Sequence, residues 1–282
     1  MPGISVVTDS GCDLPPDLVS RHAITVVPLT IRFGSEELVD GRDLTPARFW
    51  ERVASSPQLP ETAAPSPGAF EEAFRAAAGA GADGAVCITL SSSLSATFQA
   101  ATLGAQAVEG TFPVTVIDSR AVSMGQGMMA LAAARRAAEG ASLDEVAAAV
   151  GELVATTRIF AALDTLENLR KGGRIGAAQA LLGSLLSIKP IIQVTGGTVE
   201  PESKQRTRRR SLQYLADKVR QAGPVSNLAV VHGQAPDVDE LLGLLGGCSD
   251  EPPVVSQVGA VIGTHAGPSV VGVTFTTTAA GV

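Results

Sequence analysis

Short apolar runs and longer amphipathic stretches alternate along the first half of the chain. Buried strands are predicted by apolar, β-branched runs at residues 4–9, 24–34, 84–90 and 113–118. Helices are predicted by the stretches between and after them, at residues 11–23, 45–55, 69–81 and 93–110. Strands that alternate with helices of this length predict a parallel sheet with helices on both faces.

Prolines and small polar residues mark the predicted element ends. Asp13 precedes Pro15 and Pro16, so we expect Asp13 to cap the first helix and the prolines to form its first turn. Pro28 interrupts the second apolar run and breaks that strand. The segment "PQLPETAAPSPG", residues 57–68, is rich in proline and small polar residues and predicts a loop.

The second half of the chain opens with two helical stretches, at about residues 121–140 and 142–157. A second series of strands is then predicted at residues 159–164, 190–202, 227–233, 255–267 and 270–277. Gly196 and Gly197 sit at the centre of an alternating segment and predict the turn of a β-hairpin. No internal repeat is visible, and the pattern predicts an α/β protein of two domains.

The first predicted domain, residues 1–156, has a mainly parallel sheet with flanking helices. The second, residues 157–282, has a mixed sheet that contains the hairpin. Hydrophobic residues make up 45% of the chain but aromatic residues only 4%, so the cores must be built from aliphatic side chains. The formal net charge of -7 disfavours a general nucleic-acid or anionic-membrane binder, because both require a basic surface.

The cysteines and the N-terminal segment predict a compartment. Cys12, Cys87 and Cys248 are odd in number and far apart, which indicates a reducing environment with neither a disulfide framework nor a zinc site. The first residues lack the pattern of a signal peptide, and no run reaches the roughly 18 apolar residues that span a bilayer. We therefore expect a cytoplasmic protein without a metal cofactor.

A cluster of hydroxyl side chains follows the third predicted strand, in "CITLSSSLSATFQA", residues 87–100. The first amides of the next helix have no partner within that helix, and they face the sheet edge where α/β proteins bind ligands. A carboxylate or phosphate would be well placed there, with the hydroxyls as further donors. A single serine suffices to cap a helix, however, so a purely structural cluster is the alternative.

Signatures of common enzymes are weak or absent. The sequence has neither the G-x-S-x-G motif of hydrolases nor the G-x-x-x-x-G-K-[ST] motif of phosphate loops. "GQGMMA", residues 125–130, matches a dinucleotide pattern but begins several residues after its strand, so we interpret these glycines as helix-packing residues. His22 and His232 form no metal pattern with His265, which lies in the glycine-rich segment "GTHAGP".

Two short basic segments stand out in this acidic chain. "KQRTRRR", residues 204–210, contains five basic residues in seven positions, and "LRKGGRIG", residues 169–176, adds two glycines that permit close backbone approach. Each is either a solvated surface or a dock for phosphate or an acidic partner. If residues 204–208 are extended, the side chains of Lys204, Arg206 and Arg208 share one face.

The chain resembles the DegV family along nearly its full length, in six segments that follow the family's order. These segments are "VVTDSGCDLP" (6–15), "ETAAPSPGAF" (61–70), "LSSSLSATFQ" (90–99), "LRKGGRIG" (169–176), "KQRTRRRS" (204–211) and "GTHAGPSVVGV" (263–273). Ala96 and Ser269 stand where the family pattern has glycine. The resemblance implies the family's two-domain EDD fold with a buried fatty acid.

The resemblance also implies roles for individual residues. Thr62, Ser95 and His265 match the family residues that bind the fatty acid carboxylate. Ser10, Ser92 and Ser93 are expected to support them. An aliphatic composition suits a tunnel for the acyl chain, since each buried methylene contributes roughly 0.8 kcal/mol.

The resemblance further implies a role without catalysis of its own. Family members carry the lipid for a separate bacterial fatty acid kinase, which makes the acyl phosphate. Arg174, Arg206 and Arg208 are then expected to dock that kinase or the phosphate. The alternatives are a stand-alone lipid sensor or transport protein and a small-molecule kinase or hydrolase.

Overall fold

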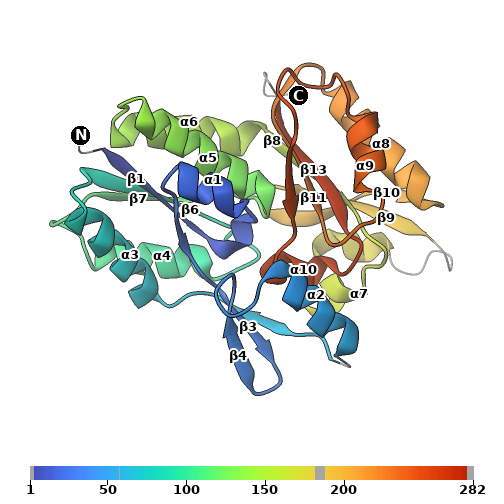
Figure 1. Ribbon diagram of the computed structural model, residues 1–282, viewed down its shortest axis with the longest axis horizontal. Coiled ribbons are helices and arrows are strands. Elements are labelled where there is room, and N and C mark those ends of the chain that lie inside the picture. The colour runs from blue at the N-terminus through green and yellow to red at the C-terminus, as the bar shows by residue number, and fades with distance from the viewer. Residues whose placement is uncertain (1–2, 57, 182–187, 278–282) are drawn as a thin grey trace.

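Two β-sheets, one parallel and one mixed, organise the molecule (Figure 1). The computed structural model describes residues 3–56, 58–181 and 188–277. The parallel sheet has the strand order β2-β1-β6-β7. Its strands are β1 (Ile4–Asp9), β2 (Thr25–Val27), β6 (Gly84–Thr89) and β7 (Val114–Asp118).

Helices cover both faces of the parallel sheet, as the alternation of strands and helices predicts. Helices α3 (Pro67–Gly79) and α4 (Thr97–Gln106) pack on one face, and α5 (Met124–Ala138) and α6 (Leu143–Thr156) pack on the other. The short helix α1 (Pro16–Arg21) links β1 to β2. Every residue of β6 is buried, which agrees with its uninterrupted apolar sequence.

The mixed sheet has six strands in the order β10-β9-β8-β13-β11-β12. The strands are β8 (Thr157–Ala162), β9 (Lys189–Thr195), β10 (Thr198–Gln205), β11 (Val225–His232), β12 (Val254–Gln257) and β13 (Val271–Thr277). Neighbours pair antiparallel except β11 and β12, which are parallel. The predicted hairpin is confirmed as β9 and β10 with Gly196 and Gly197 at the turn. Helices α8 (Arg208–Gln221) and α9 (Val238–Leu244) lie on the outer face.

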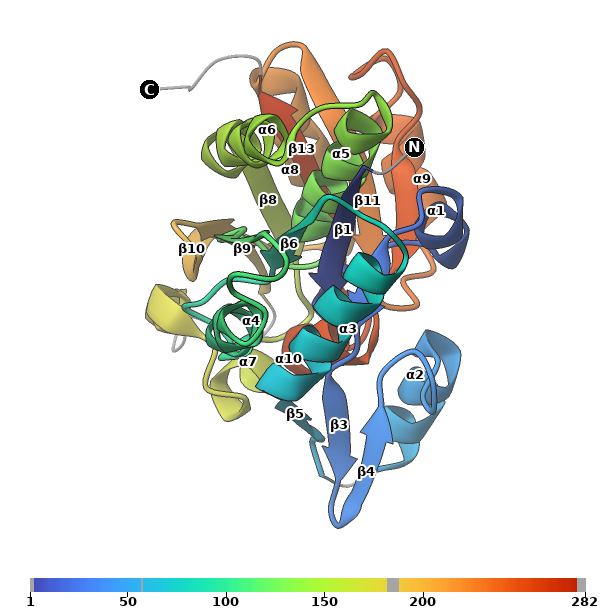
Figure 2. The same ribbon diagram turned by 90° about the vertical axis from the view of Figure 1, so that its left-hand side faces the viewer.

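A small antiparallel sheet projects below the two main sheets (Figure 2). It consists of β3 (Thr30–Phe33), β4 (Glu36–Val39) and β5 (Glu61–Ala63), with α2 (Pro46–Ser55) beside it. Pro28 breaks the predicted strand so sharply that β2 and β3 belong to different sheets. The small sheet and α2 contact helix α10 (Ala260–Ala266), and the Trp50 indole N–H donates to the Val258 carbonyl at 3.2 Å.

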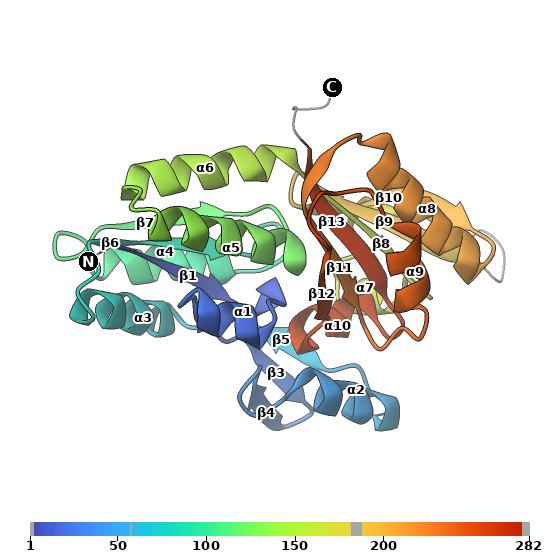
Figure 3. The ribbon, with the colours of Figure 1, turned by 45° about the horizontal axis from the view of Figure 1, so that its top comes forward.

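Helix α5 lies between the two main sheets and contacts both of them (Figure 3). The layers are therefore α3 and α4, the parallel sheet, α5 and α6, the mixed sheet, and α8 and α9. The glycines of "GQGMMA" lie inside α5, and a Cβ at Gly127 would lie 2.6 Å from the Cys12 carbonyl oxygen. The interpretation of these glycines as packing residues is confirmed.

Two predicted element types are wrong. Residues 255–267 do not form one strand, because β12 ends at Gln257 and α10 begins at Ala260. The predicted loop at residues 57–68 contains the edge strand β5, which pairs with β3 (residue 57 lies outside the described residues). Thr62 therefore lies on a strand rather than in a loop.

The first helix cap is also wrong. The cap position of α1 is Pro15, and Asp13 lies two residues earlier in a left-handed conformation with φ of 51°. Its carboxylate instead accepts hydrogen bonds from Ser123 and Gly259, far away in the sequence. The helix after the serine cluster begins at Thr97, so the serines form the preceding turn.

The part of the chain with the parallel sheet connects to the part with the mixed sheet where α6 runs directly into β8, between Thr156 and Thr157. We propose this junction as the boundary between domains 1–156 and 157–282. Residues 30–63 depart from a strict division, because the small sheet packs against α10 of the second domain. Among the described helices, none has the length and apolar character needed to cross a membrane.

Candidate functional site

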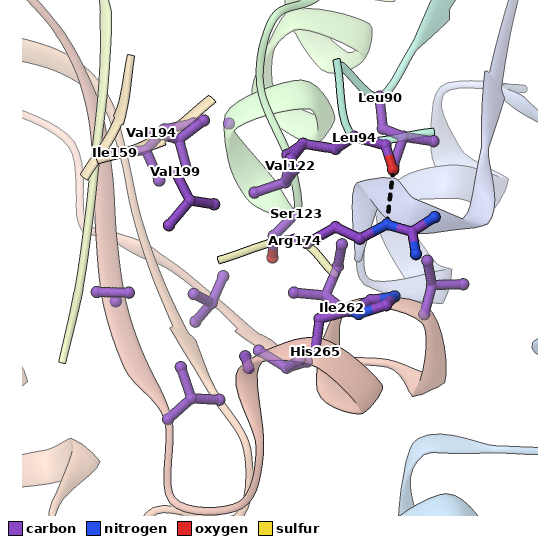
Figure 4. A pocket seen from close by; sticks show the side chains of 18 of the residues that line it. Leu90, Leu94, Val122, Ser123, Ile159, Arg174, Val194, Val199, Ile262 and His265 are labelled. Carbon is purple, nitrogen blue, oxygen red and sulfur yellow. Dashed lines mark hydrogen bonds between the residues drawn. The ribbon is translucent and has the colours of Figure 1, made fainter. Parts of the chain in front are cut away.

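A cavity of about 310 Å³ lies between the start of α5, the inner face of the mixed sheet and α10. Figure 4 shows the side chains that line it. Segments on both sides of the junction between α6 and β8 contribute, because Leu29, β5, the serine turn and the start of α5 precede it and the remaining lining residues follow it. The site therefore lies between the two main sheets, and such junctions are common locations for ligand pockets.

Most of the cavity wall is aliphatic. On the mixed sheet, neighbouring strands place Ile159, Val194 and Val199 side by side in register, and all three line the cavity. In Figure 4 they lie on the side away from Arg174 and Leu94. A small-residue position, Ala161, pairs with Gly272 in the middle of the sheet and also lines the cavity. The arrangement suits an apolar chain of substantial length.

Two predicted carboxylate-binding residues meet at the other side of the cavity. Thr62 on β5 and His265 on α10 both line it, and the Thr62 hydroxyl lies 3.1 Å from Nε2 of His265. The backbone of Gly172 lies against the imidazole, since a Cβ there would be 2.3 Å from Nδ1. This close approach explains the first glycine of "KGGR".

The imidazole of His265 is neutral at physiological pH. Burial and, to a smaller extent, the positive charge of Arg174 together lower its pKa to about 4. Nδ1 is buried without a hydrogen-bond partner among the described residues. A neutral imidazole carries one N–H, so His265 can donate a single hydrogen bond to a ligand while its other nitrogen accepts one.

Arg174 supplies the positive charge of the site. Its Nε donates to the Leu94 carbonyl at 3.1 Å, and one terminal nitrogen donates to the Gly172 carbonyl at 2.6 Å. Figure 4 shows its guanidinium beside His265. No carboxylate within the described parts of the chain forms an ion pair with it, so a bound anion would provide its counter-charge.

The serines of the cluster differ in what they contact. Ser95 lines the cavity, and its hydroxyl also contacts the Thr97 hydroxyl at 2.8 Å and accepts from the Thr97 amide at 3.3 Å. Ser91 donates to the Gly197 carbonyl at 2.6 Å and so ties the serine turn to the β-hairpin. Ser95 thus faces the cavity and Ser91 stabilises the turn, while the cap position of α4 is Ala96, which makes no side-chain cap hydrogen bond.

The three predicted supporting serines lie outside the cavity lining. The Ser92 hydroxyl donates to Asp118 at 2.5 Å, and the exposed Ser93 donates its amide to Ser91. Ser10 accepts from the Leu29 amide at 3.0 Å, in the turn after β1. Their hydrogen bonds support the serine turn and the β1 turn, and none of them places a hydroxyl in the cavity.

The second basic segment is not one extended strand with its basic side chains on a single face. Strand β10 ends at Gln205, and Thr207 caps helix α8 by accepting from the Arg210 amide. Arg208 is thus the first residue of α8, and its guanidinium makes two hydrogen bonds to Asp237, at 2.7 and 2.9 Å. Arg206 is exposed. The predicted shared face of Lys204, Arg206 and Arg208 is wrong because the helix starts within it.

Sequence reasoning did not assign two residues to the carboxylate-binding side. Arg174 was expected to dock the kinase or the phosphate, and its guanidinium lies at the polar side of the cavity. Asn168 on helix α7 (Glu167–Lys171) donates to the Thr264 carbonyl at 3.1 Å and steadies the end of α10. The pair of glycines before Arg174 was the available signal, since it indicates close packing of this turn.

Metal chemistry finds no support in the side chains. The described residues contain no group of three or more His, Cys, Asp or Glu side chains arranged to hold a metal ion. The three cysteines are all free, and Cys12 and Cys87 are buried. The chemistry of the cavity thus rests on hydroxyls, an imidazole and a guanidinium.

Sequence comparison identifies relatives along the whole chain. The model of the DegV family, described as a family of uncharacterised proteins, matches residues 3–278. A DegV domain-containing protein of Streptomyces coelicolor is 40% identical over 277 residues, which cover 96% of this chain and 97% of that protein.

Solved structures share the fold. The fatty acid binding DegV family protein of Thermus thermophilus superimposes with a TM-score of 0.90 at 34% identity, covering 98% of this chain and 99% of that one. DegV of Bacillus subtilis, a fatty acid binding protein, gives a TM-score of 0.86 at 30% identity, with 98% and 100% coverage.

Proposed function

Because this chain belongs to the DegV family, we propose that it binds a long-chain fatty acid. The acyl chain would occupy the aliphatic part of the cavity, and the carboxylate would lie at the polar side formed by Thr62, Ser95, Arg174 and His265. The fatty acid binding relatives of Thermus and Bacillus support this assignment, since they share the fold at 30% identity or more.

The observation that carries the proposal is the division of one cavity into an aliphatic side and a polar side. Each methylene removed from water contributes roughly 0.8 kcal/mol, so the chain supplies most of the affinity. The polar side then orients the carboxylate. Arg174 has no carboxylate partner among the described residues, and charge-assisted bonds from a guanidinium to a carboxylate are strong.

The neutral state of His265 fits the same role. A protonated imidazole beside Arg174 would place two positive charges next to each other in a buried site, and the lowered pKa of His265 avoids this. The hydroxyls of Thr62 and Ser95 can each donate one hydrogen bond to a carboxylate oxygen. The geometry can hold and orient a carboxylate.

Binding is tested with delipidated protein and palmitic acid. We expect palmitate to raise the melting temperature, because a ligand that binds only the folded state stabilises it. Thr62→Ala should weaken palmitate binding about tenfold or more, since a hydrogen bond to a charged group contributes roughly 1.5–3 kcal/mol. Thr102→Ala is the matched control, because Thr102 lies on α4 and bonds to the Phe98 carbonyl outside the cavity.

A finer part of the proposal concerns a partner. The bound carboxylate would be presented to a separate fatty acid kinase, where a carboxylate oxygen attacks the γ-phosphorus of ATP and ADP leaves. The exposed Arg206, with Arg209 and Arg210 beside it on α8, is the basic surface that fits docking of such a partner. Arg208 is less suited, because Asp237 already neutralises it.

Reconstitution tests this part separately. Palmitate-loaded protein is mixed with a bacterial fatty acid kinase and ATP, and acyl phosphate is measured by trapping with hydroxylamine. Formation of the hydroxamate supports the carrier role. Binding of palmitate without any acyl phosphate would favour a stand-alone lipid sensor or transport protein, and a melting curve unmoved by palmitate would contradict fatty acid binding itself.

A further inference from the structure

The turn that follows β1, residues 9–13, carries a sequence motif that the cavity does not use. Asp9 and Asp13 in this turn, together with Asp40, are buried carboxylates. None of the three forms an ion pair with a residue that the structure describes, and burial raises the pKa of Asp13 to about 7. Burying a carboxylate without a counter-charge is unfavourable, so its hydrogen bonds point to what it holds in place.

The contacts of Asp13 join two distant segments. One carboxylate oxygen accepts from the Gly259 amide at 2.9 Å, and the other accepts from the Ser123 hydroxyl at 2.5 Å. The Asp13 carbonyl also accepts from the Ser256 hydroxyl. Gly259 is the cap residue of α10, and Ser123 immediately precedes α5. One side chain therefore links the cap residues that precede both helices.

Both helices form walls of the cavity. Ser123 and Gly125 line it from the start of α5, while Ile262 and His265 line it from α10. Asp40 adds a second hold on α10, because its carboxylate interacts with the Ala260 backbone amide. The two walls are thus fixed to each other at the β1 turn rather than through the cavity.

We infer that Asp13 is a positioning residue, which sets the start of α10 against α5 and so places His265 opposite the carboxylate of the ligand. The inference rests on the proposed fatty acid function. The far end of α10 has its own hold, since Asn168 donates to the Thr264 carbonyl at 3.1 Å. Helix α10 has only seven residues, so the contacts at its two ends together set its direction.

Three variants distinguish a positioning role of the Asp13 side chain from a role of its negative charge. Asp13→Ala removes both side-chain bonds. Asp13→Asn keeps an acceptor for the Gly259 amide, can donate to the Ser123 hydroxyl, and tolerates the left-handed backbone. Asp9→Asn is the control, because Asp9 is also buried but bonds to Gly11, Leu90 and Gln126 and not to α10.

The first measurement does not require a ligand. The chain has three histidines, so the imidazole NMR signals of lipid-free protein are few and can be assigned with His265→Ala. We expect Asp13→Ala to shift the His265 signals while those of His22 stay in place. Asp13→Asn and Asp9→Asn should leave the His265 signals at their original positions. Unmoved His265 signals in folded Asp13→Ala would overturn the inference.

The second measurement is the dissociation constant for palmitate. We expect Asp13→Ala to weaken binding about tenfold or more, and Asp13→Asn to stay within about threefold of the parent. An equal loss in both variants would show that charge rather than position matters, and the inference would be wrong. If Asp13→Ala does not fold, Ser123→Ala removes one of the two bonds and is expected to shift the His265 signals away from their positions in the parent. Unmoved His265 signals in folded Ser123→Ala would then count against the role.

These two measurements also test the role of Asp13 separately from the proposed fatty acid binding. A parent protein that binds no palmitate would contradict the proposed function, while the His265 signals would still report whether Asp13 positions α10. A parent that binds palmitate, with Asp13→Ala binding equally well, would leave the function standing and remove the inference.

Discussion

The two basic segments, residues 169–176 and 204–210, look alike in the sequence but have different surroundings in the folded protein. Arg174 of the first lies at the polar side of the cavity, without a carboxylate partner among the described residues. In the second, Arg208 is paired with an acid and Arg206 is exposed. One segment offers a positive charge to a ligand, and the other divides between structure and surface.

The difference shows where a charge finds its counter-charge. Arg208 is neutralised by Asp237, which lies 29 residues further along the chain, so the local run of basic residues gave no sign of it. Arg174 is held by backbone carbonyls instead, which orient a guanidinium without cancelling its charge. An arginine fixed in this way is suited to an anionic ligand.

The largest effect is expected for Arg174→Ala on palmitate affinity. Among the described residues that line the cavity, Arg174 alone carries a positive charge, so its removal should weaken binding by about ten- to a hundredfold, as for a charge-assisted hydrogen bond of roughly 1.5–3 kcal/mol. Arg206→Ala should bind palmitate as the parent does. Calorimetry on delipidated protein measures the palmitate affinities of both variants. Equal affinities would contradict the proposal that the two basic segments differ in ligand binding.

A smaller effect is expected for Arg208→Ala on stability. The pair with Asp237 is bidentate and its side chains are about one-fifth exposed, so we expect the free energy of unfolding to fall by about 1 kcal/mol. Arg208 lowers the pKa of Asp237 below its unfolded value of 3.8. This contribution is therefore present above pH 3.8 and is lost as the pH falls through the lower folded pKa.

Urea unfolding of Arg208→Ala, Asp237→Ala and the double variant measures the coupling between the two residues. Arg206→Ala serves as the comparison and should unfold as the parent does. If the loss of unfolding free energy in the double variant equals the sum of the losses in the two single variants, Arg208 and Asp237 are not coupled. Arg208 would then behave as an exposed charge, as Arg206 does.

The pKa of His265 should report Arg174 directly. Burial is the larger cause of its lowered pKa and the charge of Arg174 the smaller one, so Arg174→Ala should raise the pKa from about 4 without restoring the usual 6.5. An NMR titration of lipid-free protein follows this change. Arg206→Ala should leave the pKa of His265 unchanged. An unchanged pKa in Arg174→Ala would mean that the Arg174 guanidinium does not lie beside His265 in solution.

The same shift predicts a pH dependence of stability. The folded pKa of His265 lies below the unfolded value of 6.5, so folding favours the neutral imidazole. Its contribution to the free energy of unfolding is present above pH 6.5 and is lost as the pH falls towards 4. In Arg174→Ala this loss should be smaller, because the two pKa values lie closer together.

The smallest effect is expected for Arg206→Ala in the kinase reaction. Exposed charges mainly steer association, so acyl-phosphate formation should slow a few-fold at low salt and recover towards the parent rate at high salt. Reconstituted reactions at two ionic strengths measure this. A normal rate at low salt would mean that the basic surface does not contribute to docking.

The sequence predicted the fold well where one periodicity dominated. The alternation of strands and helices up to residue 118 predicted the parallel sheet, and Gly196 with Gly197 predicted the hairpin. Helix α10 was missed because "VGAVIG" is rich in glycine and β-branched residues, which favour strands. Its cap residue donates to Asp13, which lies 246 residues away, so no local signal marks the start of this helix.

The candidate site was only partly predictable for a related reason. The family resemblance singled out Thr62, Ser95 and His265, and the structure places all three on one cavity. The position of Arg174 depends on the carbonyl of Leu94, 80 residues away, which no spacing in the sequence indicates. Strand β5 is three residues long at a sheet edge, too short to stand out from its proline-rich surroundings.

The polar side of the cavity draws equally on both halves of the chain. Thr62 and Ser95 precede the junction at residues 156 and 157, whereas Arg174 and His265 follow it. A bound carboxylate would therefore act as a cross-link between the halves, and neither half alone would contain a working site. Any motion that spreads the start of α5 from the mixed sheet would open the cavity that lies between them, so release of the ligand would be linked to separation of the two main sheets.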